Sequence, residues 1–255
     1  MIPIKNDREI EKMRLAGRAA SSILDRIATM IRPGLTTREV DQAAADFISD
    51  ESCRSAFLGY RGFPGQICIS VNEEVVHGIG GSRRLQYGDI VKLDVGVIKD
   101  GWVGDTATTV PVGMVEEKVA RLLRVTEETL ELAITHAHPG RRLGDLCSAI
   151  ESEIVANGYT VVREFVGHGV GRQLHEEPQV PNYGRKGSGP KLKPGMTLAI
   201  EPMVNMGGSG VRVLPDKWTV VTSDGKPSAH FEHTVLITKG DPEILTWRER
   251  KSLSK

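Results

Sequence analysis

The sequence of 255 residues lacks any run of about 18 uninterrupted apolar residues. A helix needs a run of that length to cross a bilayer. We therefore expect no membrane-spanning segment. Residues 1–9 also lack the basic and then apolar regions of a signal peptide, so export is not expected. These two absences predict a cytoplasmic protein without a membrane partner.

Cysteine is scarce, and the chain has no net charge. The three cysteines are odd in number and form no C-x-x-C pair, which argues against a disulfide framework or a thiolate zinc site. Lys plus Arg (33) equals Asp plus Glu (33), so no basic excess favours binding to nucleic acid. With 39% hydrophobic and 26% charged residues, the composition is that of an ordinary globular chain.

Two long amphipathic helices are predicted, from about residue 6 to 31 and from about 116 to 134, because apolar residues recur there at helical spacing. Each ends at a Pro-Gly pair, Pro33-Gly34 and Pro139-Gly140. A shorter helix is expected after each pair. The stop signals are 106 positions apart (139 − 33).

The strands that follow repeat at nearly the same offset. Gly88 and Gly195 each open a β-type stretch that reaches an acid six residues later, Asp94 and Glu201. Pro-Gly pairs and short apolar runs are common and can coincide by chance. The alternative is a duplicated helix-helix-strand unit. Its two copies would pack together and bring the equivalent acids near a pseudo-two-fold axis. On that interpretation residues 1–255 form a single domain.

Residues 90–97 alternate as in a half-buried strand, with Asp94 on the less apolar face. Asp100-Gly101 is a two-residue hairpin signal, so the paired positions place Asp94 opposite Ala107 and two residues from Asp105 on the same face. The two carboxylates then form a diagonal pair with Cα atoms roughly 7–8 Å apart. Such a pair often belongs to a solvated face, but it also suits a bridging metal.

Further acids and a histidine favour the metal. Glu201 and Glu232 also lie in apolar β-type runs, where an uncompensated charge is costly. His168 lies between two glycines, which leave space for a ligand. A histidine of this kind is often structural, yet beside four acids it is a candidate nitrogen donor, and the set suits manganese, iron, cobalt or zinc. His77 and His175 are further candidates.

Asp94, Asp105, His168, Glu201 and Glu232, with their flanking sequences, resemble those of the type I methionine aminopeptidases of the pita-bread fold over nearly the whole chain. The most specific segments are residues 57–64, 68–78, 94–106, 167–169, 175–178 and 194–203. The gap of 31 residues between Glu201 and Glu232 leaves no room for the type II insertion, and no cysteine-rich extension precedes the first helix. The short bacterial-type form is therefore the most similar.

The resemblance implies an α+β fold, in which duplicated helix-helix-strand units surround a central, mostly antiparallel sheet. It also implies two divalent metal ions, with Asp105 and Glu232 bridging, Asp94 completing one site, and His168 with Glu201 completing the other. Glu201 would be the general base, His175 would hydrogen-bond the substrate carbonyl, and His77 would contact the scissile amide nitrogen.

A methionine side-chain pocket is implied at five matching positions: Tyr60, Phe63, Cys68, Leu174 and Trp218. Leu174 and Phe63 depart from the residues usual there, which are aromatic and Tyr respectively. The implied activity is metal-dependent hydrolysis that removes the initiator methionine from nascent chains whose second residue is small and uncharged. We expect a cytoplasmic monomer that contacts the ribosome transiently and has no nucleic-acid specificity.

The sequence admits two other interpretations. A related pita-bread hydrolase that cleaves Xaa-Pro bonds usually carries an extra N-terminal domain, for which the first helix near residue 7 leaves no space. A non-enzymatic descendant typically loses metal ligands, whereas all five are present here.

Overall fold

The computed structural model describes residues 1–247, and the last part of the expected domain, residues 248–255, lies outside it. The helices are α1 (Asp7–Met30), α2 (Thr37–Asp50), α3 (Glu117–Thr135) and α4 (Leu143–Ala156). The strands are β1 (Arg54–Ser55), β2 (Cys68–Val71), β3 (Glu74–Val76), β4 (Ile90–Lys99), β5 (Trp102–Pro111), β6 (Thr160–Val161), β7 (Gly167–Gly169), β8 (Glu176–Val180), β9 (Thr197–Ile200), β10 (Met203–Asn205), β11 (Val211–Val213), β12 (Val220–Thr222), β13 (Ser228–His230), β14 (Glu232–Leu236) and β15 (Glu243–Ile244). No helix among residues 1–247 combines the length and hydrophobicity that membrane spanning requires.

The β4–β5 hairpin forms with the register expected from the sequence. Asp100 and Gly101 have φ angles of 50° and 79°, as the two central residues of a type I′ turn require. Lys99 therefore pairs with Trp102, and the same register places Asp94 opposite Ala107. Because side chains alternate along a strand, Asp94 and Asp105 project from the same face of the hairpin.

The largest sheet has nine strands and is antiparallel at every pair. Its central path runs β1-β4-β5-β14-β9-β7-β8, while β2 pairs with β4 and β15 with β14. Two three-stranded sheets, β13-β10-β6 and β11-β12-β3, complete the β structure. The five candidate ligands thus come from five consecutive strands, β4, β5, β14, β9 and β7, with Glu201 directly after β9.

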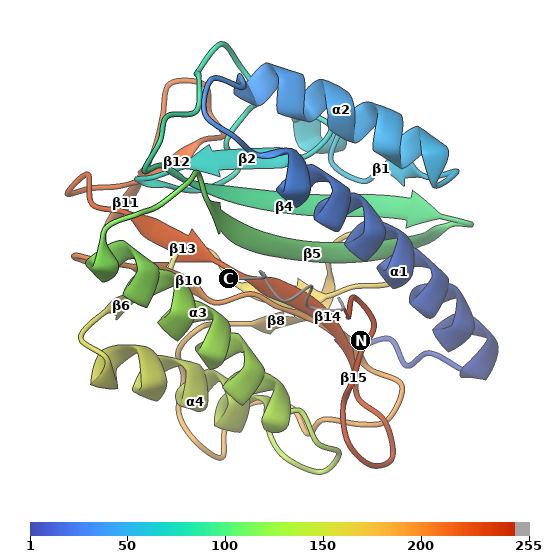
Figure 1. Ribbon diagram of the computed structural model, residues 1–255. Coiled ribbons are helices and arrows are strands. Elements are labelled where there is room, and N and C mark those ends of the chain that lie inside the picture. The colour runs from blue at the N-terminus through green and yellow to red at the C-terminus, as the bar shows by residue number, and fades with distance from the viewer. Residues whose placement is uncertain (248–255) are drawn as a thin grey trace.

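The duplicated units are present. Figure 1 shows α1 and α2 over β2, β4 and β5, and α3 and α4 on the other half of the molecule near β6, β10 and β13. Each half has its own apolar core. An isolated bridge joins Thr36 to Arg84 in one half and Arg142 to Lys191 in the other. These pairs correspond at offsets of 106 (142 − 36) and 107 (191 − 84) positions, so the prediction of a pseudo-two-fold repeat is confirmed.

Local sequence signals account for the helix starts. Asn6 caps α1 and Thr36 caps α2, each in a capping box with the glutamate three residues later. The β-type run of residues 229–237 does not form one continuous strand. Phe231 separates β13 from β14, and these two strands belong to different sheets. The chain therefore changes sheets directly before Glu232.

Candidate metal centre

A cavity of about 300 Å³ lies at the face of the large sheet where the acids project. Among its lining residues are the five candidate metal ligands, the two auxiliary histidines and the five pocket residues predicted from the sequence. These residues come from the whole length of the chain between residues 60 and 232. The structure therefore brings every sequence-predicted site residue into one place.

The acids form a buried cluster. Asp105 and Glu232 are 3% and 2% exposed, and Asp94 and Glu201 are partly buried. Burial raises the pKa of all four well above the usual range, and the neighbouring carboxylates raise the pKa values further. Arg61 is the only lysine or arginine among the described residues that lines the cavity. The cluster therefore lacks a buried counter-charge within residues 1–247.

His168 presents an unprotonated nitrogen to these acids. Its Nδ1 lies 2.9 Å from the carbonyl oxygen of Gly169 and donates to it. Burial and His175 lower the pKa of His168 to about 3, so the ring is neutral and Nε2 keeps its lone pair. Nε2 lies 3.7 Å from Oδ2 of Asp105 and 3.5 Å from Oε1 of Glu201. A carbonyl that fixes the ring tautomer in this way is typical of a metal-binding histidine.

The donor set fits divalent ions. One ligand atom from each of Asp105, His168 and Glu232 lies within 4.8 Å of the others. Oδ1 of Asp94, Oδ1 of Asp105 and Oε1 of Glu232 are buried without a hydrogen-bond partner in the described part of the chain. Buried carboxylate oxygens without partners are unfavourable unless a cation or a proton neutralises them. Oxygen-rich sites with one imidazole suit hard or intermediate divalent metals.

Two further histidines reach the cavity. Nδ1 of His175 is 2.9 Å from the Tyr60 hydroxyl, and the His175 ring lies 4.1 Å from that of His168 between centroids. His77 has a φ of 60°, an uncommon conformation for a residue other than glycine. Its ring contacts Trp218 at 6.2 Å between centroids. Burial lowers the pKa of His77 to about 4 and also lowers that of His175, so both rings are neutral near pH 7.

The rest of the cavity wall is apolar and aromatic. Phe63, Cys68 and Leu174 are buried in one apolar cluster, against which Tyr60 and Trp218 pack. The rings of Phe63 and Trp218 meet edge to face at 5.1 Å. Cys68 pairs with Asp94 in the sheet, and burial raises the pKa of its thiol well above the usual value. The thiol is therefore protonated and acts as part of the apolar wall.

Sequence reasoning missed several lining residues: Phe57, Arg61, Val76, Glu164, Phe165, Val166 and Met203. Phe57 and Arg61 lie within segment 57–64, which the sequence singled out, so their positions could have been included. The segment 164–166 precedes β7 and carried no chemical signal of its own. Phe165 contacts the His77 ring at 5.3 Å, and only the fold shows this proximity.

Comparisons with known proteins find a matching family and several similar proteins. The model of metallopeptidase family M24 matches residues 11–239. A methionine aminopeptidase from Clostridium perfringens is 50% identical over 246 residues, which cover 96% of this chain and 99% of that protein. Methionine aminopeptidase 1 from Bacillus subtilis has the same identity and coverage.

Solved structures similar to this chain include another methionine aminopeptidase and a prolidase. The methionine aminopeptidase from Thermotoga maritima superposes with a TM-score of 0.96 at 48% identity, over 97% of this chain and all of that chain. The prolidase from Pyrococcus furiosus superposes with a TM-score of 0.78 at 25% identity, over 97% of this chain but only 66% of the prolidase. The pita-bread fold expected from the resemblance is therefore confirmed.

Proposed function

The chain belongs to metallopeptidase family M24, and from this premise we propose that it removes the N-terminal methionine of proteins whose second residue is small and uncharged. Relatives that it matches at 50% identity over nearly their whole length are methionine aminopeptidases. The observation that carries the proposal is a single cavity that combines a cluster of metal-ligand side chains with an apolar pocket. Hydrolysis and recognition of the first residue can occur side by side there.

We assign Asp94, Asp105, His168, Glu201 and Glu232 as ligands of two divalent ions, with Asp105 and Glu232 shared between them. Cobalt, manganese, iron and zinc all suit this donor set. Bound there, the ions would supply an activated water at neutral pH and polarise the carbonyl of the first peptide bond. One carboxylate oxygen each of Asp94, Asp105 and Glu232 is buried without a hydrogen-bond partner among residues 1–247, which supports this assignment.

Glu201 is assigned as the general base. Its carboxylate lies beside His168, with Oε1 3.5 Å from Nε2, and therefore borders the space where the reacting water would lie. Without a bound metal, burial and the charge of Asp105 raise the pKa of Glu201. The proton it takes from water is then available to the leaving amine.

His175 and His77 are assigned to the substrate amide. When the Tyr60 hydroxyl donates to Nδ1 of His175, the neutral ring carries its proton on Nε2. That N–H can stabilise negative charge that develops on the carbonyl oxygen. His77, on the Trp218 side of the cavity, is assigned to the scissile nitrogen.

The methionine side chain is assigned to the wall of Tyr60, Phe63, Cys68, Leu174 and Trp218. A flexible thioether packs well against aromatic edges and other soft atoms, and the pocket offers both. Leu174 is smaller than an aromatic residue, so we expect it to influence which first residue binds best.

The wider setting is proposed on the same premise. We infer that residues 1–255 act as one catalytic domain and that the protein is a cytoplasmic monomer. Its substrates would be the N-termini of nascent chains, reached through transient contact with the ribosome. Cleavage of Xaa-Pro bonds is disfavoured, because the chain is 25% identical to the similar prolidase but 48–50% identical to the methionine aminopeptidases named above.

Turnover of short peptides tests the proposed function. Chelated protein is assayed with Met-Ala-Ser, Ala-Ala-Ser and Ala-Pro, before and after addition of Mn(II), Co(II) or Fe(II). We expect metal-dependent release of methionine from the first peptide alone, and no cleavage of its N-acetylated form. Preferential cleavage of Ala-Pro would favour the Xaa-Pro hydrolase instead.

A pair of aspartate variants links that turnover to the cavity. Asp105→Ala should abolish metal-dependent turnover and weaken metal binding in calorimetry, because it removes a shared ligand. Asp46→Ala changes an exposed aspartate of α2 and should retain full activity. If Asp105→Ala keeps the wild-type rate, Asp105 does not belong to the site.

A further inference from the structure

His230 is a buried histidine that the mechanism above does not use. It ends β13 and is 1% exposed. Its Nε2 has no hydrogen-bond partner among the described residues and lies 3.6 Å from Oε2 of Glu201. Because buried polar groups are almost always hydrogen-bonded, the nearest acceptor, Glu201, is the natural partner of this nitrogen.

The backbone of His230 is held firmly from β5. The hydroxyl of Thr109 donates to the carbonyl oxygen of His230 at 2.7 Å and accepts from its N–H at 3.0 Å. This reciprocal pair fixes the strand end that carries the ring.

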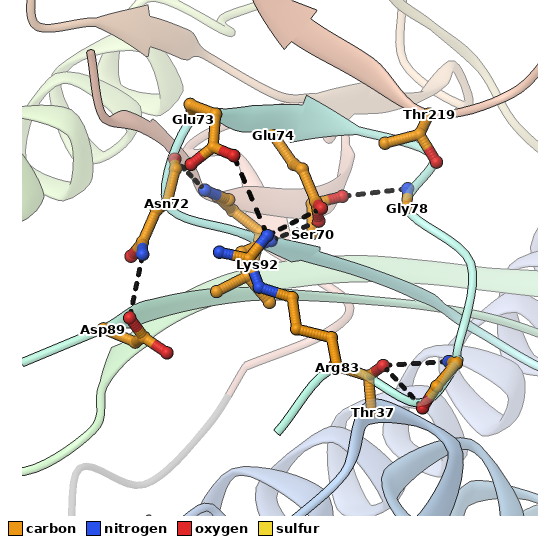
Figure 2. A network of polar contacts seen from close by, with 12 residues as sticks. Thr37, Ser70, Asn72, Glu73, Glu74, Gly78, Arg83, Asp89, Lys92 and Thr219 are labelled. Atoms are coloured by element: carbon orange, nitrogen blue, oxygen red, sulfur yellow. Dashed lines mark hydrogen bonds and ion pairs between the residues drawn. The ribbon is translucent and has the colours of Figure 1, made fainter. Parts of the chain in front are cut away.

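Lys92 holds the start of the same strand. Its ammonium donates to the carbonyl oxygen of Ser228 at 3.0 Å and to that of Asn72 at 2.7 Å. Figure 2 shows Lys92 beside the turn that carries Asn72 and Glu73. Lys92 is 1% exposed, and the carboxylates of Glu74 and Glu73 also act on its charge. The backbone of the three residues of β13 is thus held at both ends, which fixes the position from which the His230 side chain extends toward Glu201.

The carboxylate of Glu201 lies between two imidazoles. Its Oε1 faces Nε2 of His168 at 3.5 Å, and its Oε2 faces Nε2 of His230 at 3.6 Å. His168 lines the cavity, whereas His230 is absent from the residues that line it within the described chain. The ring of His230 therefore approaches Glu201 from a position that does not line the cavity.

We propose that His230 is a positioning residue that donates its Nε2–H to Oε2 of Glu201 and thereby keeps Oε1 turned toward the cavity. The 3.6 Å separation must shorten by a few tenths of an ångström for a normal hydrogen bond, which a small rotation of either side chain provides. The proposed hydrogen bond is argued from the positions of His230 and Glu201 and does not depend on the activity. Its effect on catalysis rests on the proposed function, in which Glu201 is the general base.

Three substitutions of His230 test the role in turnover. The amide nitrogen of Gln reaches about as far as Nε2 of histidine, that of Asn reaches only about as far as Nδ1, and Leu has no donor. We expect His230→Leu and His230→Asn to lower kcat for Met-Ala-Ser at least about tenfold with KM changed less than about twofold. His230→Gln should retain at least half of the wild-type kcat.

His233→Leu is the matched control. It removes a nearby imidazole whose Nδ1 bonds to Thr246 instead, and we expect a wild-type kcat. Calorimetric titration with Mn(II) should give the wild-type stoichiometry in every variant. A wild-type kcat in His230→Leu would overturn the proposal. So would equal losses in the Gln, Asn and Leu variants that follow their melting temperatures, because that pattern indicates a purely structural role.

A measurement on the metal-free protein separates this proposal from the proposed function. In histidine-labelled protein, nitrogen-15 NMR should show a directly bonded proton on Nε2 of His230. Its resonance should shift in Glu201→Gln and stay unchanged in Asp46→Ala. If the wild-type enzyme fails to cleave Met-Ala-Ser but this signal is present, the proposed function fails and the hydrogen bond stands. An unprotonated Nε2 would overturn the hydrogen bond whatever the activity.

Discussion

His175 illustrates how one side chain can serve the chemistry without holding the metal. It lies next to His168 and is bonded to the Tyr60 hydroxyl, on the more exposed side of the cavity. At this position its free N–H can reach a substrate oxygen, while the five candidate ligands lie deeper in the cavity.

Replacing His175 by Ala should therefore lower kcat by about 100-fold, the scale of losing one donor to a developing oxyanion, without changing metal stoichiometry. Steady-state kinetics and calorimetric metal titration measure the two effects separately. Loss of a bound ion would instead make His175 a ligand, in contradiction to this prediction.

Leu174 is, with Phe63, one of the two pocket positions at which the resemblance indicates a departure from the usual residue. It is 7% exposed and packs in the same cluster as Phe63 and Cys68. Leu174→Ala widens the pocket, and a change of this size in an apolar site alters discrimination by about tenfold or more.

We expect Leu174→Ala to change the ratio of kcat/KM for Met-Ala-Ser to that for Leu-Ala-Ser by at least that factor. The kcat for the better of the two substrates should change less. Leu58→Ala, a change at an exposed leucine, provides the control. An unchanged ratio would remove Leu174 from the selectivity of the pocket.

At the scale of single elements, the β4–β5 hairpin determines whether Asp94 and Asp105 share a face. Its turn requires positive φ at Asp100 and Gly101, and a Cβ added at Gly101 would meet no atom within 4 Å. Any cost of a side chain there therefore comes from the backbone conformation rather than from crowding.

Gly101→Val should destabilise the protein by about 1–2 kcal/mol, the cost of a left-handed conformation for an ordinary residue. Gly101→Asn should cost less, because Asn tolerates this conformation. Urea unfolding measures both free energies. Metal stoichiometry should stay at the wild-type value, because ten residue pairs hold the register of the hairpin. Loss of a bound ion in either variant would show that the turn alone sets this register.

At the scale of the whole molecule, the buried acids couple metal binding to stability. Burial raises the pKa values of Asp94, Asp105, Glu201 and Glu232 in the folded protein. In metal-free protein their favourable contribution is present below the unfolded pKa of about 4 and is lost as the pH rises through the raised folded values. Metal binding requires the ionised carboxylates, so it releases the retained protons.

The rise in Tm caused by Mn(II) should therefore be larger at pH 8 than at pH 6. Over the pH range in which the metal-free protein retains a proton, displacement of that proton adds about 1.4 kcal/mol per pH unit to the stabilisation by metal, or a few degrees in Tm for a chain of this size. Scanning calorimetry at each pH measures the Tm of the metal-loaded protein and of a chelated reference. Subtracting the two Tm values cancels the effect of groups such as Lys92, which titrate in both samples. An equal rise at both values would contradict the prediction.

The sequence by itself determined the local elements and their chemistry. Capping boxes at Asn6 and Thr36 specify two helix starts, and Asp100-Gly101 specifies a turn whose pairing rule places Asp94 opposite Ala107. These features could be predicted because each depends on residues that are close in the chain. The same is true of the acids in apolar strands, because burial of a charge is costly wherever the strand lies.

Only the tertiary structure decided which of these side chains meet. The order β4-β5-β14-β9-β7 aligns acids and a histidine from positions 94 to 232, and no local pattern contains that order. The pairing of β13 with β10, which begins two residues after Glu201, likewise brings His230 close to Glu201, although the two are 29 positions apart (230 − 201). Contacts between distant segments depend on how both halves pack together, which is a property of the whole chain rather than of any window of its sequence.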